Sequence, residues 1–303
     1  MITTTDYSNY FSSGTNRPGE IAASREVGIN PGISAKEIKN TRAGERALRE
    51  LEKFAGTGLK VFVDSGAFSE VSFDGGWHIV KEITEDEWMR RLAMYDRLSH
   101  RLGSQLYCVA PDLVGSQKGT LARLKKYAPR MRRLHAKGAN VIVALQRGRL
   151  TARQFAAKAA KVLGFDFVYG IPMMKGATSL EELQALAGEL KPGTRIHLLG
   201  KGVHSKDETR GGEFRPGFDK CKAAVAHLDA TFDACRIAAL VGRTNGKGGG
   251  PRVLTQARDK AQKEVGRLGL DKEAHTYEVY RRSVAAVLKN ELAQAVTTAA
   301  VAA

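Results

Sequence analysis

Acidic residues stand at the ends of three apolar segments of this chain. The segment 61–64 ends in Asp64, which begins an Asp-Ser-Gly sequence, and the segment 105–112 ends in Asp112. A third segment carries Asp229 and Asp233. Carboxylates that meet in one site can divide covalent catalysis between a nucleophile and a general acid and base. The alternative for the Asp-Ser-Gly sequence is an ordinary turn.

The spacing of Asp229 and Asp233 limits how they can act. In a strand, an offset of four residues keeps both side chains on one face but about 13 Å apart, so only one reaches the end of the strand. On a helix the two acids would be neighbours and would repel each other. We therefore expect Asp64 to pair with one of the two, and the spacing alone leaves the choice open.

Further apolar segments end in polar residues or glycine, and amphipathic segments separate them. This alternation predicts an α/β fold, an irregular TIM-like (β/α)8 barrel with an N-terminal extension and C-terminal helices. Reactive residues of such barrels lie at the C-terminal ends of the strands. The further strand segments are 140–148, 165–174 and 195–202, and the predicted helices are 85–102, 119–137, 151–163, 179–190 and 221–227.

The length of 303 residues suits one domain, with a barrel core at about 55–255 and a basic helical segment at about 253–303. The sequence lacks a long apolar run and a secretion signal, so we expect no membrane association and a cytoplasmic location (the host cytoplasm if a phage encodes the protein). The three cysteines lack C-x-x-C spacing, which predicts neither a disulfide framework nor a metal site.

The charge is strongly basic. The 48 Lys and Arg residues outnumber the 32 acids, for a net charge of +16, which favours a polyanionic partner such as nucleic acid. One group of bases lies in the segment 118–137, where a solvated helix face is the alternative explanation. A second group, Arg243, Lys247 and Arg252, lies in a glycine-rich segment whose backbone could approach phosphates.

Taken in order, the strand-end motifs from about residue 61 to residue 243 resemble those of the tRNA-guanine transglycosylase family. The segment 64–68 is similar to the D-S-G-G-F-Q motif of the family, and Phe232-Asp233-Ala234 is similar to its nucleophile motif. Between them lie Asp112, Gln146-Arg147-Gly148, Tyr169-Gly170 and His197-Leu198-Leu199-Gly200-Lys201-Gly202.

The form of these motifs and the short chain look most like the DNA-acting branch, the DpdA-type 7-deazaguanine DNA transglycosylases of phages and bacteria. That resemblance implies exchange of guanine in DNA for a 7-deazaguanine base, such as 7-cyano-7-deazaguanine, through a covalent Asp–deoxyribose intermediate, without a cofactor. The chain lacks the closely spaced cysteines of the zinc site in the tRNA enzymes, so we expect no metal. An RNA-acting transglycosylase and a non-catalytic nucleic-acid-binding barrel are the alternatives, and the oligomeric state is open.

The resemblance also implies roles for single residues. Asp233 is the expected nucleophile, with Asp229 as the second choice, and Asp64 is the expected general acid and base. Phe68, Tyr169 and Met173 are candidates for a stacking sandwich around the base. The expected base-binding residues are Ser65, Gly66, Phe68, Asp112, Gln146, Gly170, Leu199 and Gly200, and the expected DNA-binding residues are Arg243, Lys247 and Arg252.

Overall fold

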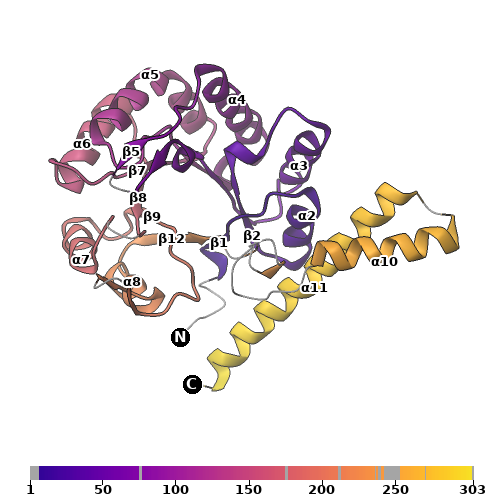
Figure 1. Ribbon diagram of the computed structural model, residues 1–303. Coiled ribbons are helices and arrows are strands. Elements are labelled where there is room, and N and C mark those ends of the chain that lie inside the picture. The colour runs from indigo at the N-terminus through magenta and orange to yellow at the C-terminus, as the bar shows by residue number, and fades with distance from the viewer. Residues whose placement is uncertain are drawn as a thin grey trace.

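Eight parallel strands form a closed barrel in the computed structural model, in the order β1-β12-β9-β8-β7-β6-β3-β2 (Figure 1). The structure describes residues 7–74, 77–174, 177–210, 213–235, 237, 240–241, 253–269 and 271–301. The barrel strands are β1 (Tyr10–Ser12), β2 (Asn30–Ser34), β3 (Val61–Asp64), β6 (Leu106–Val109), β7 (Asn140–Ala144), β8 (Val168–Pro172), β9 (Arg195–Leu199) and β12 (Asp229–Ala234). The predicted TIM-like barrel is thereby confirmed.

Helices surround the barrel and follow its strands in sequence. They are α2 (Pro18–Val27), α3 (Arg42–Glu52), α4 (Glu85–Leu102), α5 (Gln117–Ala136), α6 (Ala152–Leu163), α7 (Leu180–Glu189) and α8 (Phe218–Ala224). Thr84, Thr151 and Ser179 cap α4, α6 and α7, where each side chain accepts a hydrogen bond from a backbone N–H of the first turn. The predicted helices therefore lie where the sequence places them, with ends that differ by a few residues.

The start of the barrel differs from the prediction. The expected core began at about residue 55, after an N-terminal extension, whereas β1 and β2 supply two barrel strands before that point. Both are hard to recognise, since β1 has three residues and β2 begins Asn-Pro-Gly, a sequence typical of turns. Gly32 in β2 is required by packing, because a Cβ atom there would lie 2.2 Å from Ser13 Oγ.

Two further helices, α10 (Val253–Leu268) and α11 (Lys272–Val301), lie outside the barrel, and α11 runs beside α2 (Figure 1). The Tyr280 hydroxyl of α11 donates to Glu20 Oε1 of α2 at 2.6 Å, and the Glu20 side chain is fully buried. The predicted helical C-terminal segment is confirmed. None of the described helices is both long and apolar enough to cross a membrane.

Alternate residues of the strands face the inside of the barrel. Apolar side chains, among them Phe11, Phe62, Ile142 and Val168, fill this interior. The same alternation places polar side chains above them, at the C-terminal ends of the strands. Two short hairpins rise from this end: β4 (Val71–Ser72) with β5 (His78–Ile79), and β10 (Glu208–Arg210) with β11 (Glu213–Arg215).

Candidate active site

Donors from neighbouring strand ends fix the Asp233 carboxylate at the mouth of the barrel. Its Oδ2 accepts a hydrogen bond from Ser13 Oγ at 2.8 Å, just beyond β1. Its Oδ1 accepts from the Gly200 backbone N–H at 2.8 Å, just beyond β9, and lies 3.2 Å from His197 Nε2. Gly200 has a positive φ of 76°, which favours glycine there. Asp233 is thus oriented and mostly buried, as a positioned nucleophile requires.

His197 is a fully buried partner of Asp233 to which the sequence assigned no role. Its ring stacks on Phe62 with centroids 4.8 Å apart, and its Nδ1 lies 2.8 Å from Thr231 Oγ1. The Thr231 hydroxyl also donates to the Ile196 carbonyl at 3.3 Å, so the ring is held on both of its nitrogen sides by β12. His197 therefore orients the carboxylate. His197 is a single histidine in a mostly apolar strand, so no spacing to other polar residues marks it as a site residue in the sequence.

Asp64 lies at the end of β3, on the same mouth. Its Oδ2 accepts from the Gly66 N–H at 2.9 Å and lies 3.4 Å from Ser34 Oγ. Burial raises the pKa of Asp64, the charge of Asp233 adds to the rise, and the Gly66 hydrogen bond opposes it. A carboxyl whose pKa is raised has the direction of shift that favours a general acid.

Asp112 gathers two other predicted base-binding residues. Its Oδ1 accepts from Ser65 Oγ at 2.8 Å, and its Oδ2 accepts from Gln146 Nε2 at 3.0 Å. Gln146 Oε1 in turn accepts from the Gly115 N–H at 2.8 Å. Burial raises the pKa of Asp112 to about 7, against the opposing effect of the Ser65 hydrogen bond. Three residues from different loops thus form one buried polar set.

The raised pKa of Asp112 predicts a pH dependence of stability. Well below pH 4 the carboxyl is protonated in both states, and as the pH rises from there toward 7 the unfolded chain ionises before the folded one, which favours unfolding. Wild type should therefore lose more unfolding free energy than Asp112→Asn between pH 4.5 and 7.5, by a few kcal/mol at most. Urea denaturation of both proteins at the two pH values measures the difference. Equal losses would contradict a raised pKa.

Two arginines hold the backbone beneath this polar set. Arg91 donates to the Ser65 carbonyl at 2.7 Å, and Arg123 donates to the Asp112 carbonyl and to both oxygens of the buried Glu70. Each guanidinium carbon lies 5.3 Å from the Trp88 ring. Arg123, one of the bases of the segment 118–137, is therefore part of the scaffold of the site. Lys126 and Lys137 of that segment pair with Glu85 and Asp96, which favours the alternative of a solvated helix face there.

Asp229 lies at the opposite end of the barrel from the proposed chemistry. It begins β12, is exposed, and stands in register with Arg195 at the start of β9. Asp229 and Asp233 share a strand face, as their spacing predicts, and only Asp233 reaches the mouth. The structure therefore does not support Asp229 as the second choice of nucleophile.

The other predicted residues are only partly brought together. A Cβ at Gly170 would lie 2.8 Å from Ile142 Cγ2, so packing between β7 and β8 already explains this glycine. Leu199 packs against the interior cluster. Phe68 packs against Phe73 and Tyr169 against Phe167, and the expected stacking sandwich around a base stays a prediction.

Two predictions are not tested by these observations. Arg243, Lys247 and Arg252 lie outside the described residues. Within the described part of the chain, no group of three or more His, Cys, Asp or Glu side chains could hold a metal ion. The expectation of no zinc stays a prediction, which elemental analysis of the purified protein tests.

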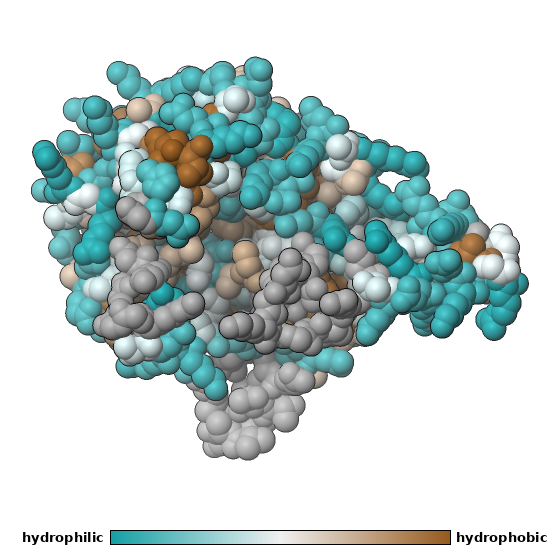
Figure 2. Space-filling view, in the orientation of Figure 1, coloured by the Kyte–Doolittle hydropathy of each residue, from teal (hydrophilic) through white to brown (hydrophobic). Residues whose placement is uncertain are grey.

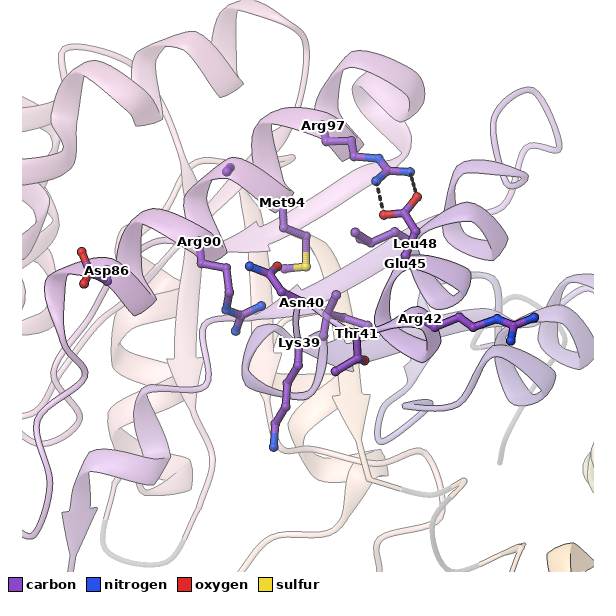
Figure 3. Close-up of a pocket in the computed structure, with 12 residues that line it drawn as sticks. Lys39, Asn40, Thr41, Arg42, Glu45, Leu48, Asp86, Arg90, Met94 and Arg97 are labelled. Atoms are coloured by element: carbon purple, nitrogen blue, oxygen red, sulfur yellow. Dashed lines mark hydrogen bonds and ion pairs between the residues drawn. The ribbon is translucent and has the colours of Figure 1, made fainter.

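Two cavities lie near the rim of the barrel. The larger, of about 750 Å³, lies between α3 and α4, where Arg97 forms a bidentate pair with Glu45 (Figure 3). None of the predicted site residues lines it. The second, of about 510 Å³, is lined by Gln146, by apolar side chains that include Leu145 and Ile171, and by three arginines: Arg147, Arg149 and Arg153. The second cavity thus adjoins the polar set of Asp112.

No protein-family model and no curated protein matches the chain. Solved structures are similar to it at low identity. An assigned fructose-1,6-biphosphate aldolase from Coccidioides immitis is 12% identical with a TM-score of 0.49, over 97% of this chain and 92% of that one. A D-allulose 3-epimerase from Methylomonas sp. is 12% identical with a TM-score of 0.41, over 75% and 84%. A 2,3-dimethylmalate lyase is 14% identical with a TM-score of 0.44, over 98% and 95%. Likeness at this level carries no inference about function.

Proposed function

We propose that this protein is a glycosyltransferase of the base-exchange type, which replaces guanine in DNA by a 7-deazaguanine base. The observation that carries the proposal is the pair of unlike carboxyls at the mouth. Asp233 is oriented by three hydrogen-bond partners, while the pKa of Asp64 is raised. A nucleophile and an acid in distinct environments are what a retaining displacement at an anomeric carbon needs.

In the first step, an Asp233 oxygen attacks C1′ of the nucleotide. The bond between C1′ and the base breaks, and its electron pair leaves with guanine, which takes a proton from Asp64. The product is an ester between Asp233 and the sugar, with Asp64 ionised. The two carboxyls thus supply the nucleophile and the proton that this step consumes.

In the second step, the incoming deazaguanine loses its ring N–H proton to Asp64. The nitrogen attacks C1′ from the face that guanine left, and Asp233 departs as a carboxylate. Two displacements give net retention at C1′ and return both carboxyls to their starting states.

The polar set of Asp112, Ser65 and Gln146 is suited to reading the base. A carboxylate accepts hydrogen bonds from a purine ring N–H and amino group, and the Gln146 amide can donate to the exocyclic oxygen. Because the pKa of Asp112 is about 7, ionisation of Asp112 for this contact is favoured above neutral pH. These residues thus fit guanine and 7-deazaguanines, which share that edge.

The charge of the chain supports a polymer substrate. Chemistry on a base inside a duplex requires that the nucleotide be flipped out or single-stranded. The net charge of +16 favours a phosphate backbone as partner. The choice of DNA over RNA rests on the family resemblance of the motifs.

A covalent-adduct assay tests the proposal. Protein is mixed with guanine-containing DNA or RNA oligonucleotides and resolved on a denaturing gel. A shifted, denaturation-resistant band with DNA is expected. A band with RNA alone would identify an RNA enzyme, and the absence of both adduct and exchange of labelled guanine would leave only the binding-barrel alternative.

The basic segment after the last strand gives a separate prediction. Neutralising Arg243, Lys247 and Arg252 together should weaken DNA binding uniformly across sequences and flatten the log–log salt dependence by up to about 3 units. Exchange at saturating DNA should fall much less, since these groups would hold phosphates. Binding titrations across a salt series measure both effects. Unchanged affinity and slope would rule this segment out as the phosphate contact.

A further inference from the structure

Exposed hydrophobic side chains are concentrated on one hairpin beside the mouth. Of the eight large hydrophobic side chains found exposed in the described part of the chain, five lie between residues 68 and 80. On the face of the molecule in Figure 2, a hydrophobic patch lies at the upper left, where Figure 1 labels β5. The five are Phe68, Phe73, Trp77, Ile79 and Val80, with exposed fractions of 45%, 52%, 42%, 40% and 56%. We call them the aromatic hairpin.

The aromatic hairpin is held firmly in spite of its exposure. The Phe68 and Phe73 rings pack with centroids 5.8 Å apart. Trp77 Nε1 donates to the Val114 carbonyl at 2.6 Å, and the indole covers Gly115, where a Cβ would lie 2.5 Å from Nε1. The Trp77 indole is therefore held against the loop after β6, and the Phe68 and Phe73 rings support each other.

The buried Glu70 connects the aromatic hairpin to the polar set of Asp112. The buried Glu70 accepts from the Val80 N–H through its carbonyl and from the Ile83 N–H through its side chain. The same side chain pairs with Arg123, which donates to the Asp112 carbonyl. The hairpin is thus tied to Asp112 on one side and continues directly from the Asp64 turn on the other.

We propose that the aromatic hairpin is the platform on which the bases that flank the extracted guanine stack. This inference rests on the proposed function and adds a contact to it. Extraction of one base removes stacking from its neighbours, and aromatic faces in water can replace that loss without reading sequence. A nucleic-acid strand presents flat bases, which stack on aromatic rings, and phosphates, which are attracted to a basic protein. The combination of exposed aromatic rings with a net charge of +16 therefore favours nucleobases over a purely apolar ligand.

The test is a binding cycle on single-stranded oligonucleotides that contain one guanine. Phe68→Ala with Phe73→Ala should weaken binding by at least about tenfold, since each lost stack is worth about that much. The salt dependence should stay unchanged, because no phosphate contact is removed. An oligonucleotide with abasic sites on both sides of the guanine should bind wild type and the double variant equally.

Control and competing outcomes are separable. Leu268→Ala on α10 removes a side chain of 55% exposure far from the mouth and should leave binding unchanged. An equal loss with intact and abasic oligonucleotides would overturn the platform. So would unchanged binding combined with a shift from dimer to monomer in sedimentation, which would make the patch a contact between two copies. Oligonucleotide binding can be measured without base exchange. If no covalent adduct forms but the double variant weakens binding only to the intact oligonucleotide, the proposed reaction is wrong and the stacking platform stands.

Discussion

Asp233→Asn should lower base exchange by about 10⁴-fold or more while leaving oligonucleotide affinity nearly unchanged. An amide does not form the ester with C1′, yet its oxygen can still accept the Gly200 N–H and its nitrogen can donate to Ser13. The fold around β12 should therefore survive. Exchange of labelled guanine and the denaturing-gel adduct measure the loss, and filter binding measures the affinity.

The chain offers a matched control on the same strand. Asp229→Asn makes the same chemical change on the same face of β12, at the opposite end of the barrel. It should retain exchange close to the wild-type rate. Loss of exchange in Asp229→Asn with retained exchange in Asp233→Asn would contradict the assignment, and activity in both variants would reject a covalent mechanism through this strand.

Asp64→Asn should lower exchange by about 10²–10⁴-fold, the usual contribution of a general acid and base. In wild type, the rate of guanine release should fall as the pH rises through the raised pKa of Asp64, because the ionised form has no proton to give. This limb should be missing from the profile of Asp64→Asn. Single-turnover adduct formation over a pH series measures both.

A substrate that needs no proton separates Asp64 from Asp233. N7-methylguanine leaves as a neutral base, so an oligonucleotide carrying it should form the adduct with Asp64→Asn at a rate near that of wild type. The same oligonucleotide should form none with Asp233→Asn. A failure to rescue Asp64→Asn would show that Asp64 does more than deliver the proton.

The sequence predicted the parts of the barrel in which one physical signal dominates. Most of the strands from β3 onward are largely buried apolar runs whose polar ends mark the mouth, so the sequence places Asp64, Asp112 and Gln146 at one end of the barrel, whereas the choice of Asp233 over Asp229 came from the family resemblance. Strands β1 and β2 escaped because their residues favour turns in isolation, and tertiary pairing outweighs that preference.

One missed residue of the site follows from a missed strand. Ser13 holds Asp233 from just beyond β1, so its role could not be inferred while β1 was taken for an extension. The polar residues around Ser13 are easily recognised in the sequence, but their types do not show that they lie at the mouth of the barrel. Arg91 and Arg123 donate to the backbone carbonyls of Ser65 and Asp112. Every residue has such a carbonyl, so the types of the accepting residues do not reveal the contact.

The pairing of β1 with β12 has a consequence for how activity arises during synthesis. Ser13 and Asp233, which share a hydrogen bond, are separated by 220 positions. The other seven barrel strands precede β12 in the chain and can begin to pair as they emerge from the ribosome. Asp233 arrives only with β12, and its contact with Ser13 forms only when β12 pairs with β1 and closes the barrel. Competence therefore appears in one late event. A fragment that ends before β12 would retain the base-reading residues without the group that attacks the sugar.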